Sequence, residues 1–125
     1  MQNIGSRGGE SVALMNLGIV YDALEQYQQA IDFYQQSLAI TREVGEACGT
    51  STALRNDEAN LLIGLGNAYC SLGQYQQAID LYQQSLAITR EIGEAYGTNI
   101  ALRKGEADSL GNLGNTYRAL GQYQQ

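Results

Sequence analysis

The sequence predicts an all-α fold built of about five long helices that pack in antiparallel pairs. Three observations support this prediction: a long segment that recurs along the chain, apolar residues at helical spacing, and the absence of proline from all 125 residues. Leu, Ala and Gln are abundant, and such unbranched side chains lose little rotamer freedom in a helix. With no proline to end a helix, we expect glycine to separate one helix from the next.

The recurring segment defines a long period. The stretch from Tyr27 to Glu43 returns from Tyr75 to Glu91 with one change, so the period is 75 − 27 = 48. A third copy opens at Tyr123 with the same offset (123 − 75 = 48). The chain therefore holds two full periods and part of a third (125 = 2 × 48 + 29). We interpret residues 1–125 as a single repeat domain, with copies at approximately 5–51, 52–99 and 100–125, the last incomplete.

Each period contains two stretches with helical spacing. In the second copy, Leu54, Leu61, Leu65 and Leu72 follow one another at steps of seven and four, and a second stretch begins at Tyr75. This spacing fits the period of a helix and not the alternation of a strand. We expect helices at roughly 52–72, 75–96 and 100–120. An extra short helix or a loop in residues 45–57 is the alternative.

Charge and composition argue against several kinds of partner. The net charge is −6, and the chain lacks the basic stripe that a phosphate backbone requires. We therefore expect no nucleic acid and no anionic membrane surface as partner. No apolar run approaches the roughly 20 residues that span a bilayer, and the polar, glycine-rich N-terminus lacks the apolar core of a signal peptide. A cytoplasmic protein is the default expectation.

The residue inventory also argues against catalysis. There is no His to act as a base or as a ligand, and Cys48 and Cys70 lie too far apart for a Cys-x-x-Cys pair. The glycines of the stretch from Gly64 to Gly66 and of Gly111 to Gly114 fall within predicted helices, so they are not a phosphate-binding loop. We expect no enzyme, no metal and no cofactor.

The residues around Gly66 resemble the tetratricopeptide repeat (TPR) motif. The same frame occurs in the first copy, and its opening part in the third. In the second copy the motif consists of Leu62, Leu65, Gly66, Tyr69, Leu72, Gly73, Tyr75, Ala78, Tyr82 and Ser85. The resemblance covers nearly the whole chain, which we interpret as a fragment of a larger array. It implies a right-handed superhelical solenoid whose concave groove is lined by the first helix of each repeat and binds a protein or peptide.

Two departures from the TPR pattern stand out. The family period is about 34 residues, and a proline ends the second helix, whereas this chain has Arg42 and Arg90 at that position. The excess length of each repeat equals nearly two helical turns for each of its two helices, so both helices can lengthen and keep the same apolar face. Glu25 stands where the other copies have Gly73 and Gly121, which predicts a slightly different first turn. Longer repeats of this type occur in adaptor, motor-cargo and bacterial signalling proteins.

The resemblance places a partner-binding groove on specific side chains. These positions change between copies while the scaffold does not, which indicates either a surface that reads a partner or drift on an unconstrained exposed face. Asn67 and Asn115 suit the backbone amides of an extended peptide. Ile63 and Gly111 stand where chaperone-binding TPRs carry a lysine, which argues against a carboxylate clamp. The predicted groove residues are Met15, Ile19, Asp22, Asn60, Ile63, Asn67, Cys70, Ser71, Asp108, Asn115 and Arg118.

Two other functions remain open at this stage. The first helix of the third copy would lack its partner helix, so a homodimer or an open stack could form through it. The residues predicted for this self-association are Leu110, Leu113, Tyr117 and Leu120. A peptide-sensing signalling regulator is the further alternative.

Overall fold

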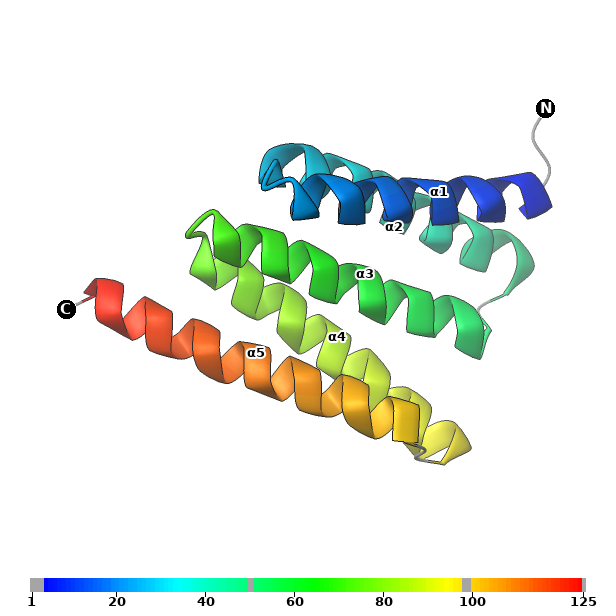
Figure 1. Cartoon of the computed structure of the whole chain (residues 1–125). Coiled ribbons are helices and arrows are strands. Elements are labelled where there is room, and N and C mark those ends of the chain that lie inside the picture. The colour runs from blue at the N-terminus through cyan, green and yellow to red at the C-terminus, as the bar shows by residue number, and fades with distance from the viewer. Residues whose placement is uncertain (1–3, 50, 98–99, 125) are drawn as a thin grey trace.

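The computed structural model describes residues 4–49, 51–97 and 100–124, and these residues form five α-helices and no strand. The helices are α1 (Ile4–Ala23), α2 (Tyr27–Cys48), α3 (Thr52–Ser71), α4 (Tyr75–Tyr96) and α5 (Ile100–Gln124). Successive helices run in opposite directions, with α1, α3 and α5 in one layer and α2 and α4 in a second layer behind it (Figure 1). The predicted all-α solenoid of antiparallel helix pairs is confirmed.

The helix bounds reproduce the period of the sequence. The first helices α1, α3 and α5 begin one period apart (52 − 4 = 48 and 100 − 52 = 48), as do the second helices α2 and α4 (75 − 27 = 48). The helices predicted at 52–72 and 75–96 are confirmed to within one position at each end. The alternative of a loop or short helix in residues 45–57 is wrong, because α2 continues to Cys48 and α3 begins at Thr52.

Helix α5 is longer than predicted. The end expected near Gly121 is not found, and the helix continues to Gln124. At the equivalent Gly73 the chain turns back because α4 packs along α3. A glycine inside a helix permits a turn but does not require one, and α5 continues through Gly121.

The two turns inside the repeats share one geometry. Gln26 N–H donates to the Tyr21 carbonyl (N···O 2.9 Å) and Glu25 N–H to the Asp22 carbonyl (3.0 Å), which is the Schellman arrangement. The turn at Gly73 has the equivalent two bonds at 2.9 and 3.0 Å. Glu25 adopts φ 61° where Gly73 adopts φ 80°. The first turn therefore keeps the hydrogen bonds of the second and differs from it slightly in φ at this residue.

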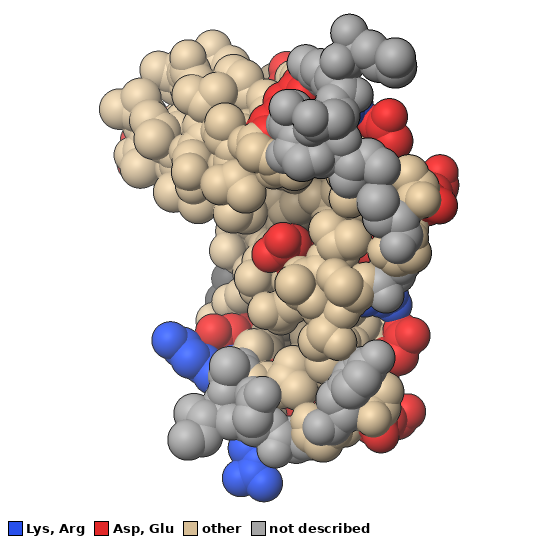
Figure 2. All heavy atoms as spheres, turned by 90° about the vertical axis from the view of Figure 1, so that its right-hand side faces the viewer, with Lys and Arg blue, Asp and Glu red and all other residues tan. Residues whose placement is uncertain are grey.

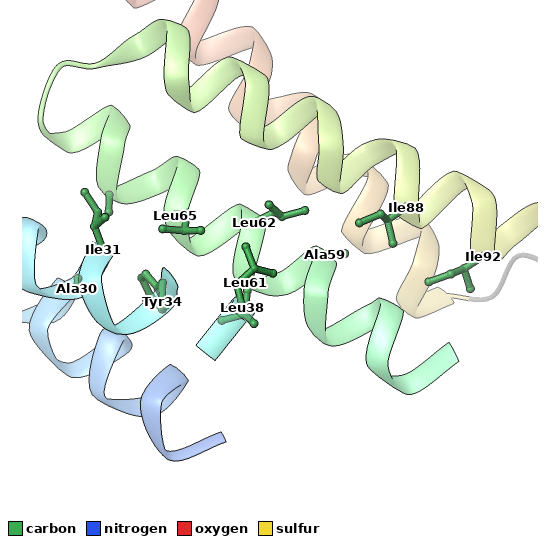
Figure 3. Close-up of a cluster of buried hydrophobic side chains, with 11 residues drawn as sticks. Ala30, Ile31, Tyr34, Leu38, Ala59, Leu61, Leu62, Leu65, Ile88 and Ile92 are labelled. Carbon is green, nitrogen blue, oxygen red and sulfur yellow. The ribbon is translucent and has the colours of Figure 1, made fainter. Parts of the chain in front are cut away.

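The buried core lies between the two layers and crosses the repeat boundary. One cluster joins α2, α3 and α4 (Figure 3), and a second joins α4 to α5 through Leu113. Neighbouring repeats therefore share a core and do not fold as separate units. The first cluster consists of Ala30, Ile31, Tyr34, Leu38, Ala59, Leu61, Leu62, Leu65, Ala68, Ile88 and Ile92.

Close contact within each repeat depends on a glycine against a tyrosine. A Cβ atom added to Gly66 would lie 2.6 Å from Cε1 of Tyr82, and one added to Gly18 would lie 2.6 Å from Cε1 of Tyr34. The two pairs have the same spacing in the sequence, and each joins the first helix of a repeat to the second. Gly66 leaves room for the Tyr82 ring where the two helices of its repeat approach closely. Gly114, the third equivalent, has nothing within 4 Å of that Cβ position.

Candidate protein-binding surface

The eleven predicted groove residues all lie on α1, α3 and α5, and none of them is buried. On α3, Asn60, Ile63 and Asn67 follow at steps of three and four, on the opposite side from the buried Leu62 and Leu65. We call these eleven residues the first-helix face. It consists of Met15, Ile19 and Asp22 on α1, Asn60, Ile63, Asn67, Cys70 and Ser71 on α3, and Asp108, Asn115 and Arg118 on α5.

The chemistry of the first-helix face changes from one helix to the next. On α1 it is mainly apolar, with the half-buried Asp22 at its end: Ile19 is 51% exposed, and Val12, two turns earlier on the same side, is also 51% exposed. On α3 it presents the amides of Asn60 and Asn67. On α5 it carries charged groups. A segment that crosses the three helices would therefore meet an apolar, then an amide, then a charged strip.

One hydrogen bond fixes the amide at the centre of this face. The hydroxyl of Tyr82, which is 2% exposed, donates to Oδ1 of Asn67. Burial, followed by the nearby Cys70 and Asp22, raises the pKa of Tyr82 well above its ordinary value, so the hydroxyl keeps the proton it donates. Because its oxygen is engaged, Asn67 has its two N–H donors left for a partner.

The centre of the face links all three first helices. Asp22 of α1 is half-buried, and this burial raises its pKa. The charge of Asp22 contributes, after burial, to the raised pKa of both Tyr34 and Tyr82. Sγ of Cys70 on α3 lies 3.8 Å from Oγ1 of Thr116 on α5. The contact between Cys70 and Thr116 therefore joins the face on α3 to the next repeat.

A hollow of about 470 Å³ lies on the other side of α3, between α2 and α4. The backbones of these two helices do not approach each other, and the buried Leu62 and Leu65 of α3 form the floor between them. Gln35, which lines the hollow, donates to the hydroxyl of Tyr69 (3.4 Å). None of the predicted groove residues lines this hollow, and sequence reasoning did not find it. The repeated Gln35 and Gln83 were the available signal.

Ion pairs connect neighbouring helices near the end of the molecule where α2 and α4 stop. Arg42 Nε binds Glu58 Oε2 at 3.0 Å, and Arg90 Nε binds Glu106 Oε1 at 3.1 Å, one period later. Each pair joins a second helix to the next first helix. The two arginines that replace the family proline therefore form contacts between repeats. Figure 2 shows this end, where acidic side chains are spread from top to bottom.

A second set of ion pairs lies within the repeats. Arg55 binds Glu58 on its own helix and Glu91 on α4, and Arg7 binds Glu10 and Glu43 in the same way. The sequence shows that these residues recur with the repeat, but the recurrence alone does not reveal that they are partners. Glu58 thus receives Arg42 and Arg55 together.

The four residues predicted for self-association divide into two groups. Leu110 and Tyr117 are 47% and 51% exposed on α5. Leu113 is 8% exposed and packs with the core of α4, and the half-buried Leu120 packs against the same cluster. Leu113 is buried because it is equivalent to Leu65 and faces the preceding repeat. The open face of α5 therefore has Leu110 and Tyr117 as its large apolar side chains.

Within the described part of the chain, no group of three or more His, Cys, Asp or Glu residues is placed to hold a metal ion. No described helix combines the length and the apolar character needed to cross a bilayer.

Stacked helix pairs with a shared core define a helical repeat protein. The chain matches the family model described as tetratricopeptide repeat over residues 1–43 and 57–125. It belongs to the tetratricopeptide repeat family, whose members are typically non-catalytic and mediate protein–protein interaction. The unmatched residues 44–56 are those at the end of α2 and the start of α3, where the helices exceed the family length. No curated protein matches the chain.

Proposed function

We propose that the chain is a non-catalytic scaffold that binds a peptide or an extended protein segment across the first-helix face. The observation that carries this proposal is the Asn67 amide, whose oxygen is held by the buried Tyr82 hydroxyl while its N–H donors remain available. An extended peptide has a backbone carbonyl at every residue to accept such donors. The exposed Val12 and Ile19 beside Met15 offer an apolar strip for its side chains.

The test is a selection of random peptides displayed on phage, followed by calorimetry with variants of the chain. Substitution of the exposed Asn67 by Ala should weaken a selected peptide about two- to tenfold, because its hydrogen bonds are lost. Arg118→Ala should weaken peptides that carry an acidic residue. The matched control is Gln84→Ala, because Gln84 lines the hollow between α2 and α4 and is not part of the first-helix face. Loss of binding with the control and not with Asn67→Ala would refute the proposal.

A second candidate function is association of two copies through α5. The supporting observation is the exposure of Leu110 and Tyr117, whose equivalents Leu62 and Tyr69 lie in or against the core. Light scattering over a dilution series should then show a species heavier than 13.6 kDa. Because Leu110 is exposed, Leu110→Glu should restore the monomer without unfolding the chain. A monomer at every concentration would exclude this candidate.

A further inference from the structure

The first-helix face carries opposite charges at its two edges. Asp22, Cys70 and Arg118 are one period apart in the sequence (22 + 48 = 70 and 70 + 48 = 118), so they occupy the same position on α1, α3 and α5. We call these three residues the charged row. A segment that crosses the face along this row meets a carboxylate on the first of the three helices and a guanidinium on the last.

Neither charge has an ionic partner within the described part of the chain. Asp22 and Arg118 take part in no ion pair there, whereas Arg42 and Arg90 each bind a glutamate of the following helix. Asp22 is half-buried, and this loss of water raises its pKa because the charged form is disfavoured. A cationic group of a bound segment would offset that loss. The exposed Arg118 is open to an anionic group.

Two side-chain contacts keep the three helices of the charged row close together. The ring of Tyr34 reaches both α1 and α3: a Cβ atom added to Gly18 would lie 2.6 Å from its Cε1, and one added to Gly64 would lie 3.1 Å from its Cζ. Next along the row, Sγ of Cys70 lies 3.8 Å from Oγ1 of Thr116 on α5. The two edges of the row are therefore separated by two spacings between neighbouring helices.

This separation limits the length of the segment that can join the two edges. The axes of helices in contact are roughly 8–10 Å apart, so the helices of Asp22 and Arg118 are about 16–20 Å apart. An extended chain rises about 3.3 Å per residue, and alternate side chains point to the same side. Two side chains on one side and six positions apart are thus separated by about 20 Å, whereas four positions give only about 13 Å. A spacing of six positions fits the row.

A neighbouring row of the same face supplies contacts to the backbone of such a segment. Ile19, Asn67 and Asn115 are also one period apart, and each lies three residues before its member of the charged row. The oxygen of Asn67 accepts from Tyr82, so its two N–H donors can reach the backbone carbonyls between the two charged side chains. The charged row therefore adds selection by charge to contacts that any extended segment can make.

We propose that the first-helix face selects extended segments with one basic and one acidic residue six positions apart, the basic side chain at Asp22 and the acidic one at Arg118. This inference rests on the proposed function, since it names the class of segment that the same face binds. Two basic or two acidic residues at these positions would place one of them against a like charge, which disfavours such segments.

The test uses four phage libraries of peptides with randomised central positions. The two outer residues, six positions apart, are fixed as Lys and Glu, as Glu and Lys, as two Lys or as two Glu. The chain should enrich both mixed libraries over both like-charge libraries, because an extended peptide can cross the face in either direction. Arg118→Glu, a change at an exposed position, makes both edges acidic and should instead enrich the library with two lysines.

Calorimetry then measures the affinity of one synthetic peptide selected from the Lys and Glu library. Arg118→Gln and Asp22→Asn should each weaken it about two- to fivefold, as for a partly exposed ion pair, and high salt should reduce both effects. The matched control is Arg103→Gln, because Arg103 is exposed on the same helix and lies outside the first-helix face. This variant should leave the affinity unchanged. Circular dichroism checks that all variants keep their helices.

Failure of this inference can be told apart from failure of the proposed function. If Asn67→Ala weakens the peptide while Asp22→Asn and Arg118→Gln leave its affinity unchanged, the face binds segments without selecting charge, and the inference is overturned. Equal enrichment of the four libraries would overturn it in the same way. If no library yields a peptide that Asn67→Ala weakens, the proposed function fails and this inference fails with it.

Discussion

Glu25 shows how a single residue tolerates a conformation that the fold imposes. Its φ of 61° lies in the left-handed region, which costs an L-residue roughly 1–2 kcal/mol because Cβ crowds the backbone. The cost is accepted because packing of α2 along α1 and the Schellman hydrogen bonds fix the turn. The sequence shows that Glu25 stands where the other copies have Gly. It does not show whether the turn changes its shape or Glu25 adopts the left-handed conformation.

Replacing Glu25 by Gly should raise the free energy of unfolding by about 0.5–1 kcal/mol, since the strain is removed and part of the gain is lost to the greater freedom of glycine in the unfolded chain. Urea unfolding followed by circular dichroism measures this change. The matched control is Gly73→Glu, which places the same side chain in the equivalent turn (φ 80°) and should be destabilising. Equal stability of all three proteins would contradict the assignment of strain to Glu25.

Tyr34 makes stability depend on pH at the alkaline end. Burial, and then the charge of Asp22, raises the pKa of Tyr34 to about 12 from 10.0. The folded chain therefore holds the phenolic proton more tightly than the unfolded chain. This contribution to stability is fully present below the unfolded pKa of 10.0 and is lost as pH rises from there through about 12.

The free energy of unfolding should thus fall between about pH 8 and about pH 11, and it should fall less for Tyr34→Phe. Tyr82 acts in the same direction, so part of the dependence should remain in this variant. Urea unfolding at the two pH values gives the comparison. An identical fall in the wild type and in Tyr34→Phe would exclude Tyr34 as a source.

At the scale of helices, the fold was largely predictable because the same pattern of apolar residues and glycines recurs in successive copies. Apolar spacing located α3 and α4, and Gly49, Gly73 and Gly97 marked where helices end, each with positive φ. The end of α5 was not predictable in the same way. Gly121 permits a turn, but α5 continues through it to Gln124.

The Gly66 and Gly114 positions separate helix propensity from helix packing. Gly66→Ala should destabilise the chain by about 1–3 kcal/mol, because the new methyl group would lie 2.6 Å from the ring of Tyr82. Gly114→Ala should stabilise it by about 0.5–1 kcal/mol, since nothing lies within 4 Å and alanine favours the helix. Thermal unfolding of the two variants provides the measurement. Effects of the same sign would contradict the packing that we assign to Gly66.

At the scale of the whole molecule, sequence reasoning placed the proposed surface on side chains that are not buried, and it missed the contacts that support it. The register of the repeat placed Asn67 and Arg118 on the exposed side of their helices. It did not reveal that Tyr82 holds Asn67, because this bond joins residues on two helices whose rotation is set by packing. From the sequence, Arg42 could be recognised only as a departure from the family proline. Its ion pair with Glu58 forms because α2 and α3 of neighbouring repeats pack together.

The exposed apolar surfaces also belong to the whole molecule. Leucines on α1 and α5 follow the same pattern as the buried leucines of α3. Their exposure depends on which helices surround them and not on their own sequence. We propose that the first-helix face, which runs across α1, α3 and α5, is the surface that binds a protein segment.

The most direct test of this claim is an NMR titration of the isotope-labelled chain with a phage-selected peptide. We expect shifts of the Asn67 and Asn115 side-chain amides and of the backbone amides near Ile19, with little change at Gln35 and Gln84. Shifts confined to Gln35, Gln84 and the hollow between α2 and α4 would contradict it, and would place binding on the opposite side of α3.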